Sequence, residues 1–147
     1  YSGYINKKLK LTSDGTPKRP FVHISDLCDL IDKFLKENRS FNKEIFNVGS
    51  SSLNLSIKQV AEAIAVFLNI ERVEYGAFDS DQRSYYLNFD KLHKTFDNHN
   101  IEYNLEKGLS DLINNFEKYK ITGNEVRLDK INKLVKQKKL DTRLYWI

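Results

Sequence analysis

Arg19 is the charged residue of this 147-residue sequence whose surroundings best suit ligand binding. It stands between a run of turn-forming residues and a short apolar run. Its aliphatic stem can therefore pack while the guanidinium projects into a cleft. A guanidinium is a planar fork of five N–H donors that matches the oxygens of a phosphate group. A solvated arginine at the edge of a strand is the alternative that the residues alone leave open.

The histidines and the cysteine give no catalytic or metal-binding pattern. The histidines are His23, His93 and His99. None has a second ligand at the spacing that a zinc site needs, and we interpret His23 as a hydrogen-bonded residue at the end of a strand. Cys28 lies near a predicted helix start, where a thiol pKa can fall. We interpret it as a small core-facing residue, and we predict no catalytic residue and no metal site in this chain.

Two further patterns have ordinary explanations. Asp26, Asp29 and Asp32 follow one face of a predicted helix, and a solvated face explains them better than paired acid/base carboxylates. Tyr4 and Lys8 fit Tyr-x-x-x-Lys, in which lysine lowers the pKa of the tyrosine. One such match is expected by chance among eight tyrosines and many lysines. The sequence has no Gly-x-Gly-x-x-Gly, Walker loop or nucleophile elbow, so it predicts no cofactor-binding residues.

Strand and helix patterns alternate around Arg19. Leu9–Thr12 and Phe21–Ile24 are predicted strands on either side of a turn at Ser13–Pro17. Ser25 is the predicted N-cap of the next helix. That helix has an apolar stripe at helical spacing, consisting of Leu27, Leu30, Ile31, Phe34 and Leu35.

The rest of the chain continues this alternation. The sequence predicts, in order, a strand at Glu44–Gly49, a helix opened by a capping box of Ser56 and Gln59, a strand at Arg72–Phe78, helices capped by Asn88 and Asn104, and an amphipathic helix at Glu125–Leu140. The pattern favours an α/β fold with some parallel strand pairing.

Length and composition fit one globular domain. A chain of 147 residues with 40% apolar content can bury a core. No run approaches the ~18 apolar residues of a membrane-spanning helix. The single cysteine excludes an intramolecular disulfide and suits a reducing compartment, so we expect a cytoplasmic location. The sequence lacks methionine and begins at Tyr1, so we expect a missing N-terminal portion, with removal of a leader as the alternative.

The net charge of +4 is concentrated near the C-terminus. Residues 118–147 hold nine basic and three acidic side chains, whereas residues 1–117 hold 15 and 17. A basic patch can bind nucleic acid. Here the lysines fall mostly on the polar face of an amphipathic helix, and the aromatic residues Tyr145 and Trp146 come only at the end. A solvated face or a subunit contact is the better interpretation, and we expect no nucleic-acid partner.

Several stretches together resemble a known family. Leu9–Leu27, LKLTSDGTPKRPFVHISDL, is similar to the C-terminal half of extended short-chain dehydrogenases/reductases. This group includes the NAD-dependent nucleotide-sugar epimerases and dehydratases. Their pattern here is a turn with Gly, then Arg-(Pro/Asp)-aromatic-Val-His-Val-x-Asp and a helix. Further matches follow in the family's order at Glu44–Gly49, Asn54–Ile57, Asp81–Tyr85, Phe89–Leu92 and Tyr103–Ile113.

The resemblance covers residues 9–117, and residues 118–147 form a basic C-terminal helix and tail. It implies that residues 1–147 form the substrate-binding C-terminal portion of a Rossmann-like protein, with the last sheet strands and a mostly helical subdomain. The implied contacts are Leu11 and Thr12 at the nucleotide base, Arg19 at the diphosphate, Asn54 at the nucleotide, and Arg83 at the diphosphate or ribose. Before Arg83, the family's Arg-x-Gly-Asp is replaced by Gly76–Asp79.

The resemblance also implies parts that this sequence does not contain. The glycine-rich NAD loop and the catalytic Tyr-x-x-x-Lys at its proper place are absent. NAD or NADP would therefore be bound mainly by residues outside this chain, in an N-terminal dinucleotide-binding half, and the intact enzyme is expected to be a homodimer. The implied function is nucleotide-sugar binding in an NAD(P)-dependent nucleotide-sugar epimerase or dehydratase. A non-catalytic sugar-nucleotide binding or assembly module is the alternative.

Overall fold

The computed structural model of the chain describes residues 1–37, 40–77, 83–96, 100–119, 127–141, 143 and 145–146. The chain divides into two compact units, one of Ser2–Ile113 and the other of Tyr1 with Asn114–Ile147. All the strands of the described residues belong to the first unit. Among the sequence matches above, Asp81 and Gln82 lie outside the described residues, as do Phe78, Asp79 and His99.

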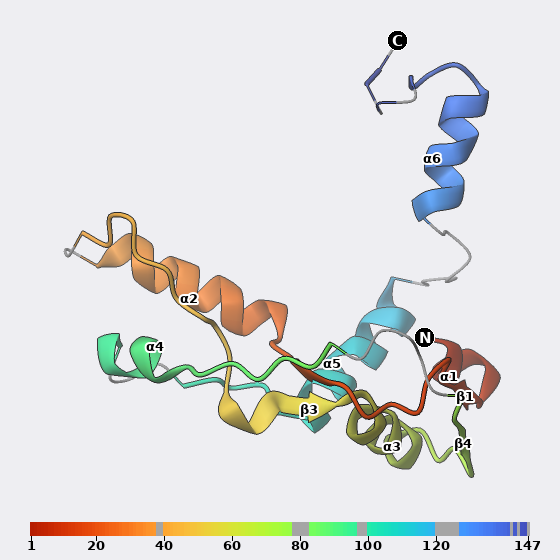
Figure 1. Ribbon diagram of the computed structural model, residues 1–147, viewed down its shortest axis with the longest axis horizontal. Coiled ribbons are helices and arrows are strands. Elements are labelled where there is room, and N and C mark those ends of the chain that lie inside the picture. Colours follow the sequence, from red (N-terminus) through yellow and green to blue (C-terminus); the bar gives the residue numbers. More distant parts are fainter. Residues whose placement is uncertain are drawn as a thin grey trace. The chain divides into compact units, whose positions relative to one another are not determined.

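Short strands alternate with helices along the first unit (Figure 1). The elements are α1 (Ser2–Asn6), β1 (Leu9–Lys10), β2 (Lys18–Pro20), α2 (Ile24–Lys36), the 3-10 helix η1 (Ser51–Leu53), β3 (Asn54–Ser56), α3 (Ile57–Phe67), β4 (Val73–Glu74), α4 (Asp90–Thr95) and α5 (Leu105–Lys118). This is the α/β alternation that the sequence predicted.

The strands pair into two small sheets. β1 and β4 are parallel, with Leu9 opposite Val73, which confirms the predicted parallel pairing. The N–H of Leu11 continues this contact by donating to the carbonyl of Glu74 at 2.8 Å. β2 and β3 are antiparallel, with Arg19 opposite Leu55. Arg19 thus belongs to a strand and not to the turn before it.

The predicted turn at Ser13–Pro17 is confirmed. Asp14 Oδ1 accepts a hydrogen bond from the N–H of Thr16 at 3.0 Å. Gly15 has a φ of +75°, and its carbonyl accepts from the N–H of Lys58 at 2.8 Å. A Cβ at Gly15 would lie 2.9 Å from that same nitrogen, so the close approach of the turn to α3 requires glycine.

The start of α2 differs from the prediction. Phe21–Ile24 is not a strand, because the strand is β2 and Ile24 already begins the helix. The N-cap is His23 and not Ser25. The Nδ1 of His23 accepts a hydrogen bond from the N–H of Ser25 at 3.2 Å. At most N-caps this acceptor is a side-chain oxygen. The interpretation of His23 as a hydrogen-bonded structural residue is confirmed, at a helix start instead of a strand end.

Asp26 is buried, which corrects the interpretation of a wholly solvated acidic face. Only 2% of the residue is exposed. Its two carboxylate oxygens accept from the backbone N–H groups of Glu102, at 2.8 Å, and Tyr103, at 3.2 Å. These bonds fasten α2 to the segment that leads into α5. The solvated interpretation holds for Asp29 and Asp32, which are exposed.

The main apolar cluster of the first unit lies where α2 faces α4 (Figure 1). Its members are Leu30, Leu92 and Phe96, with Phe34, Phe41, Phe46 and Val48 packed against them. Leu30 and Phe34 thus confirm part of the predicted stripe, but Ile31 and Leu35 are exposed. Cys28 is also exposed, against the prediction of a core-facing residue. Glu44–Gly49 is an irregular segment and not the predicted strand.

The helix caps agree best with the sequence. Both hydrogen bonds of the capping box form between Ser56 and Gln59, at 3.1 and 2.8 Å. The Oδ1 atom of Asn104 accepts from the N–H of Lys107 at 2.8 Å. These two starts could be predicted because each capping bond joins residues three positions apart. The predicted cap at Asn88 is wrong, because the N-cap of α4 is Phe89 and no side chain caps this helix. The Oδ1 of Asn88 instead accepts from the N–H of Asp90, the first residue of α4, at 2.7 Å.

The second unit contains the end of α5 from Asn114 onward, α6 (Arg127–Lys136) and a C-terminal turn. α6 lies within the predicted helix Glu125–Leu140, whose first two residues fall outside the described part. After α6, Leu140 bridges to Trp146. The backbone N–H of Tyr145, foremost, and that of Arg143 donate to Asp141 and hold the pKa of its carboxyl below the ordinary value.

Gly76 and Gly108 offer a matched pair of substitutions. A Cβ on Gly76 would collide with the backbone carbonyl of Thr12, where β1 and β4 lie together. On helical Gly108 the nearest atom would be a His23 carbon at 3.7 Å. We expect Gly76→Ala to lower the free energy of unfolding by about 1–3 kcal/mol and Gly108→Ala to raise it by about 0.5–1 kcal/mol. Urea denaturation measures both, and equal effects would contradict this packing.

The buried Asp26 gives a second stability prediction. Asp26→Ala leaves the N–H groups of Glu102 and Tyr103 without their acceptor, so we expect a loss of about 2 kcal/mol or more in the free energy of unfolding. Asp29→Ala is the control on the same helix, because Asp29 is exposed and its removal should change stability by less than about 0.5 kcal/mol. If Asp26→Ala is as harmless as the control in urea denaturation, the anchoring role is wrong.

Candidate functional site

β2 carries two neighbouring cations, each beside an exposed tyrosine ring. The Arg19 guanidinium carbon lies 5.0 Å from the ring centroid of Tyr85. The Lys18 Nζ lies 5.9 Å from the ring centroid of Tyr86. Within the described residues, neither cation pairs with a carboxylate. Because successive side chains of a strand point to opposite faces, each cation lies with its own tyrosine ring on one face of the sheet, where its positive charge can attract an anion.

The guanidinium of Arg19 is fixed along one side. Its Nη1 donates to the carbonyl of Lys18 at 2.8 Å and to the carbonyl of Arg83. Its Nε and Nη2 have no hydrogen-bond partner in the part of the chain that the structure describes. A guanidinium held in this way keeps donors for an incoming phosphate and loses little rotational freedom when it binds.

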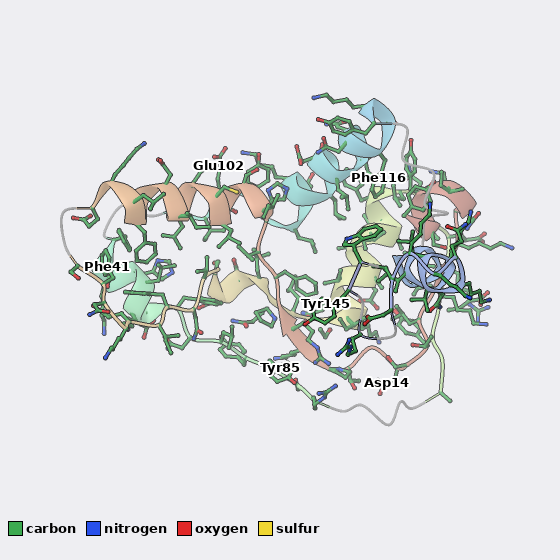
Figure 2. All side chains as sticks on the ribbon, turned by 90° about the horizontal axis from the view of Figure 1, so that it is seen from above. Asp14, Phe41, Tyr85, Glu102, Phe116 and Tyr145 are labelled. Carbon is green, nitrogen blue, oxygen red and sulfur yellow. The ribbon has the colours of Figure 1, made fainter. Side chains whose placement is uncertain are left out.

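The segment 83–88 runs beside β2 and β3, although Arg83 comes 64 positions after Arg19. The N–H of Tyr85 donates to the carbonyl of Lys18 at 3.0 Å. In return, the N–H of Lys18 donates to the Ser84 hydroxyl at 3.0 Å. Figure 2 shows the labelled Tyr85 on this segment beside the β2 ribbon. These bonds hold the segment beside β2, where the guanidinium of Arg19 contacts the main-chain carbonyl of Arg83, so that two predicted site residues meet.

Asn54, another predicted site residue, lies at the same place. It begins β3 opposite Pro20 and is 7% exposed. Its Nδ2 donates to the carbonyl of Leu87 at 3.0 Å, and its Oδ1 accepts from the N–H of Leu87 at 3.1 Å. Both polar atoms of the side chain therefore bond to the segment 83–88.

Leu11 and Thr12 contact β4 and Gly76, and not the group of Arg19, Asn54 and Arg83. Leu11 is half-buried against β4, and Thr12 is exposed with its carbonyl facing Gly76. No hydrogen bond in the described part joins either residue to Arg19, Asn54 or Arg83. The structure thus brings three of the five predicted site residues together, and the turn at Ser13–Pro17 separates the other two from them.

The residue-based prediction missed Lys18, Tyr85 and Tyr86. Their signal was present, because a tyrosine pair follows Arg83 by two residues and a lysine precedes Arg19. What the sequence did not show is that these two runs lie side by side. Aromatic faces next to cations suit a nucleotide, whose base and phosphates need both kinds of contact.

A separate pocket of about 280 Å³ lies between α3, α5 and the start of α2. Its lining is mostly apolar, with His23 and Tyr103 stacked at 3.8 Å between ring centroids. The Nε2 of His23 lies 3.3 Å from Asp111 Oδ2. Both ring nitrogens of His23 therefore contact other parts of the protein, Nδ1 at Ser25 and Nε2 at Asp111. We assign His23 no part in the group around Lys18 and Arg19. In the described part of the chain, no helix has the length and apolar character to cross a membrane.

Sequence comparisons match part of the chain to known proteins. The NAD dependent epimerase/dehydratase family model matches residues 3–49. Over 63 residues, the chain is 32% identical to UDP-D-apiose/UDP-D-xylose synthase of Oryza sativa subsp. japonica. This stretch is 42% of the present chain and 16% of the rice protein.

Solved structures match a larger share. dTDP-glucose 4,6-dehydratase from Bacillus anthracis str. Ames, solved in complex with NAD, matches with a TM-score of 0.65 and 28% identity over 80% of this chain and 37% of its own. The Bordetella bronchiseptica enzyme WbmG, in complex with NAD and UDP, matches with a TM-score of 0.63 and 24% identity over 81% of this chain and 38% of its own. The chain therefore spans less than two-fifths of the length of either structure.

These matches confirm the resemblance that the sequence motifs indicated. The sequence match includes β1, the turn, β2 and α2, and the structural match extends over four-fifths of the chain. Residues 3–49 thus match the NAD dependent epimerase/dehydratase family model, and the chain has the Rossmann-like fold of the corresponding part of these solved structures.

Proposed function

We propose that this chain is the nucleotide-sugar-binding part of an NAD(P)-dependent nucleotide-sugar epimerase or dehydratase. One observation carries the proposal: Arg19 on β2 and the backbone of Arg83 meet at an edge that also presents Lys18 and two tyrosine rings. The family match over residues 3–49 supports it, and so does the structural likeness to an enzyme solved with NAD and UDP.

The proposed ligand group is the diphosphate of a nucleotide sugar. Arg19 donates from Nε and Nη2, because Nη1 is already occupied by two carbonyls. We expect Arg83, whose main chain contacts the guanidinium, to add positive charge at the same place. Charge-assisted hydrogen bonds of this kind contribute about 1.5–3 kcal/mol each. The exposed rings of Tyr85 and Tyr86 give the nucleoside a surface on which to stack.

Binding at the diphosphate serves the reaction by fixing the position of the sugar. Contacts remote from the reacting atoms place the sugar ring at the reaction centre and lower the entropy cost of the chemical step. Leu11 and Thr12 stay predicted contacts of the base, on the far side of the turn. We place Arg19 at the diphosphate and Arg83 at the diphosphate or ribose, with Asn54, the predicted nucleotide residue, next to them on β3.

The chain's own residues do not fit a dinucleotide cofactor. A phosphate-binding loop needs closely spaced glycines before a helix. The six glycines here are spread along the sequence, at positions 3, 15, 49, 76, 108 and 123. We therefore place NAD or NADP, the catalytic tyrosine and the hydride transfer on a dinucleotide-binding half outside residues 1–147, and we propose that the intact enzyme is a homodimer.

Replacement of Arg19 tests the diphosphate contact. We expect Arg19→Ala to weaken the binding of UDP about tenfold or more, because a charge-assisted fork is lost. Arg19→Lys should fall between this variant and the unchanged protein, since lysine keeps the charge without the planar fork. Isothermal titration calorimetry at low salt measures the dissociation constants.

Arg72→Ala is the matched control. Arg72 is exposed beside β4 and is not part of the group around Arg19, so its replacement should leave the affinity for UDP unchanged within about twofold. UDP affinity that is the same in Arg19→Ala as in the unchanged protein would overturn the proposed function. The proposed function would also be overturned if Arg19→Ala and Arg72→Ala weakened UDP binding equally, because the loss would then come from the lower net charge of the protein.

A further inference from the structure

Asn54 uses its amide as if it were a peptide group of a neighbouring strand. Its Nδ2 and Oδ1 bond to the carbonyl and N–H of one and the same residue, Leu87, 33 positions later. A primary amide has the same donor and acceptor as a backbone peptide unit. The two bonds therefore replace one pair of backbone hydrogen bonds of a β-sheet. Within the described residues, no strand other than β2 pairs with β3.

Other hydrogen bonds attach the segment 83–88 near its two ends. It contains no helix or strand of its own. At its beginning, Lys18 bonds to Ser84 and Tyr85, and Arg19 bonds to the carbonyl of Arg83. At its end, Asn47 Nδ2 donates to the carbonyl of Asn88 at 3.0 Å. The two bonds of Asn54 lie between these ends and join the segment to the buried side of β3.

The side chain of Asn54 is badly placed to meet a ligand. It is 7% exposed, and each of its two polar atoms already has a partner. By contrast, Tyr85 is 45% exposed, and Arg83 is also exposed. The residues that can meet a ligand are thus those of the segment, and Asn54 decides where the segment lies.

We propose that Asn54 is a positioning residue for the nucleotide site, acting through the main chain of Leu87 and without touching the ligand. The two hydrogen bonds set the register of residues 83–88 against β2. This register places the Tyr85 ring under the Arg19 guanidinium and brings Arg83 beside it. The inference rests on the proposed function for its ligand, but the contact itself makes a prediction without any ligand.

Amide hydrogen exchange of the full chain tests the contact first. In Asn54→Ala, the amides of Leu87 and Tyr85 should exchange at least about tenfold faster. The Leu87 N–H loses its acceptor, and the Tyr85 N–H is no longer held opposite the carbonyl of Lys18. The Leu11 amide, bonded to Glu74 in the other sheet, should keep its rate and shows whether the variant is folded. If Tyr85 keeps its rate while Leu87 changes, Asn54 does not position the segment and the proposal is overturned.

UDP binding then separates positioning from direct contact. We expect Asn54→Ala and Arg83→Ala each to weaken UDP binding about tenfold. The double variant should lose clearly less affinity than the product of the two single losses, because the Arg83 contact is one of those that Asn54 positions. Losses that multiply to about a hundredfold would show that Asn54 meets the ligand independently, and would overturn the proposal. Asn47→Ala, which removes one bond at the end of the segment, is the control and should weaken binding less than threefold.

The two proposals fail on different results. UDP affinity that is unaffected by Arg19→Ala counts against the proposed function, and the exchange rates of Leu87 and Tyr85 still decide the role of Asn54. If Asn54→Ala fails to fold, Asn54→Asp takes its place in the exchange measurement. It keeps an oxygen for the Leu87 N–H but loses the donor to the Leu87 carbonyl, so Tyr85 exchange should rise more than Leu87 exchange.

Discussion

The main chain of residues 83–88 is held against β2 and β3 by hydrogen bonds, and the proposed site depends on this attachment. The strands are only three residues long, so a regular ladder offers few rungs. Polar side chains supply the other bonds between the strands and the segment. A backbone group on the opposite side is the partner of Ser84, of Asn54 and of the Arg19 guanidinium. Buried backbone groups need partners, and here the same bonds bring the cations and the aromatic rings together.

Buried residues fix the chain on both sides of the contact between residues 83–88 and the strands β2 and β3. Phe89 follows the segment directly and is 1% exposed, so the chain is fixed where α4 begins. On the other side, Asp26 ties the start of α2 to the segment before α5. Arg19 thus projects from a short strand whose surroundings are fixed by contacts far along the sequence. Such preorganisation favours ligand binding, because fewer side chains must be ordered when the ligand arrives.

Local chemistry explains what the sequence predicted well. The capping box at Ser56, the cap at Asn104 and the glycine turn at Gly15 all involve partners a few residues apart or a backbone conformation that one residue type prefers. The failures involve distant partners. Phe21–Ile24 has strand-forming residues, yet β3 pairs with the preceding three residues. Asp26 looked solvated because its partners, Glu102 and Tyr103, come 76 and 77 positions later.

The same distinction applies to the site. Arg19 stood out by its own surroundings, and family resemblance added Asn54 and Arg83. The sequence could not show that Asn54 faces Leu87, because only the folded chain joins residues 33 positions apart. Nor did it show that Lys18 and the two tyrosines complete the group. Leu11 and Thr12 follow a different sheet, so their predicted contact with the base depends on how far a ligand reaches across the turn at Ser13–Pro17.

A crystal structure of the protein with bound UDP tests the central claim most directly. We predict that diphosphate oxygens lie within hydrogen-bonding distance of Nε or Nη2 of Arg19, with Arg83 beside them and the Asn54 amide still bonded to Leu87. UDP bound away from β2, for example in the apolar pocket between α3 and α5, would contradict it.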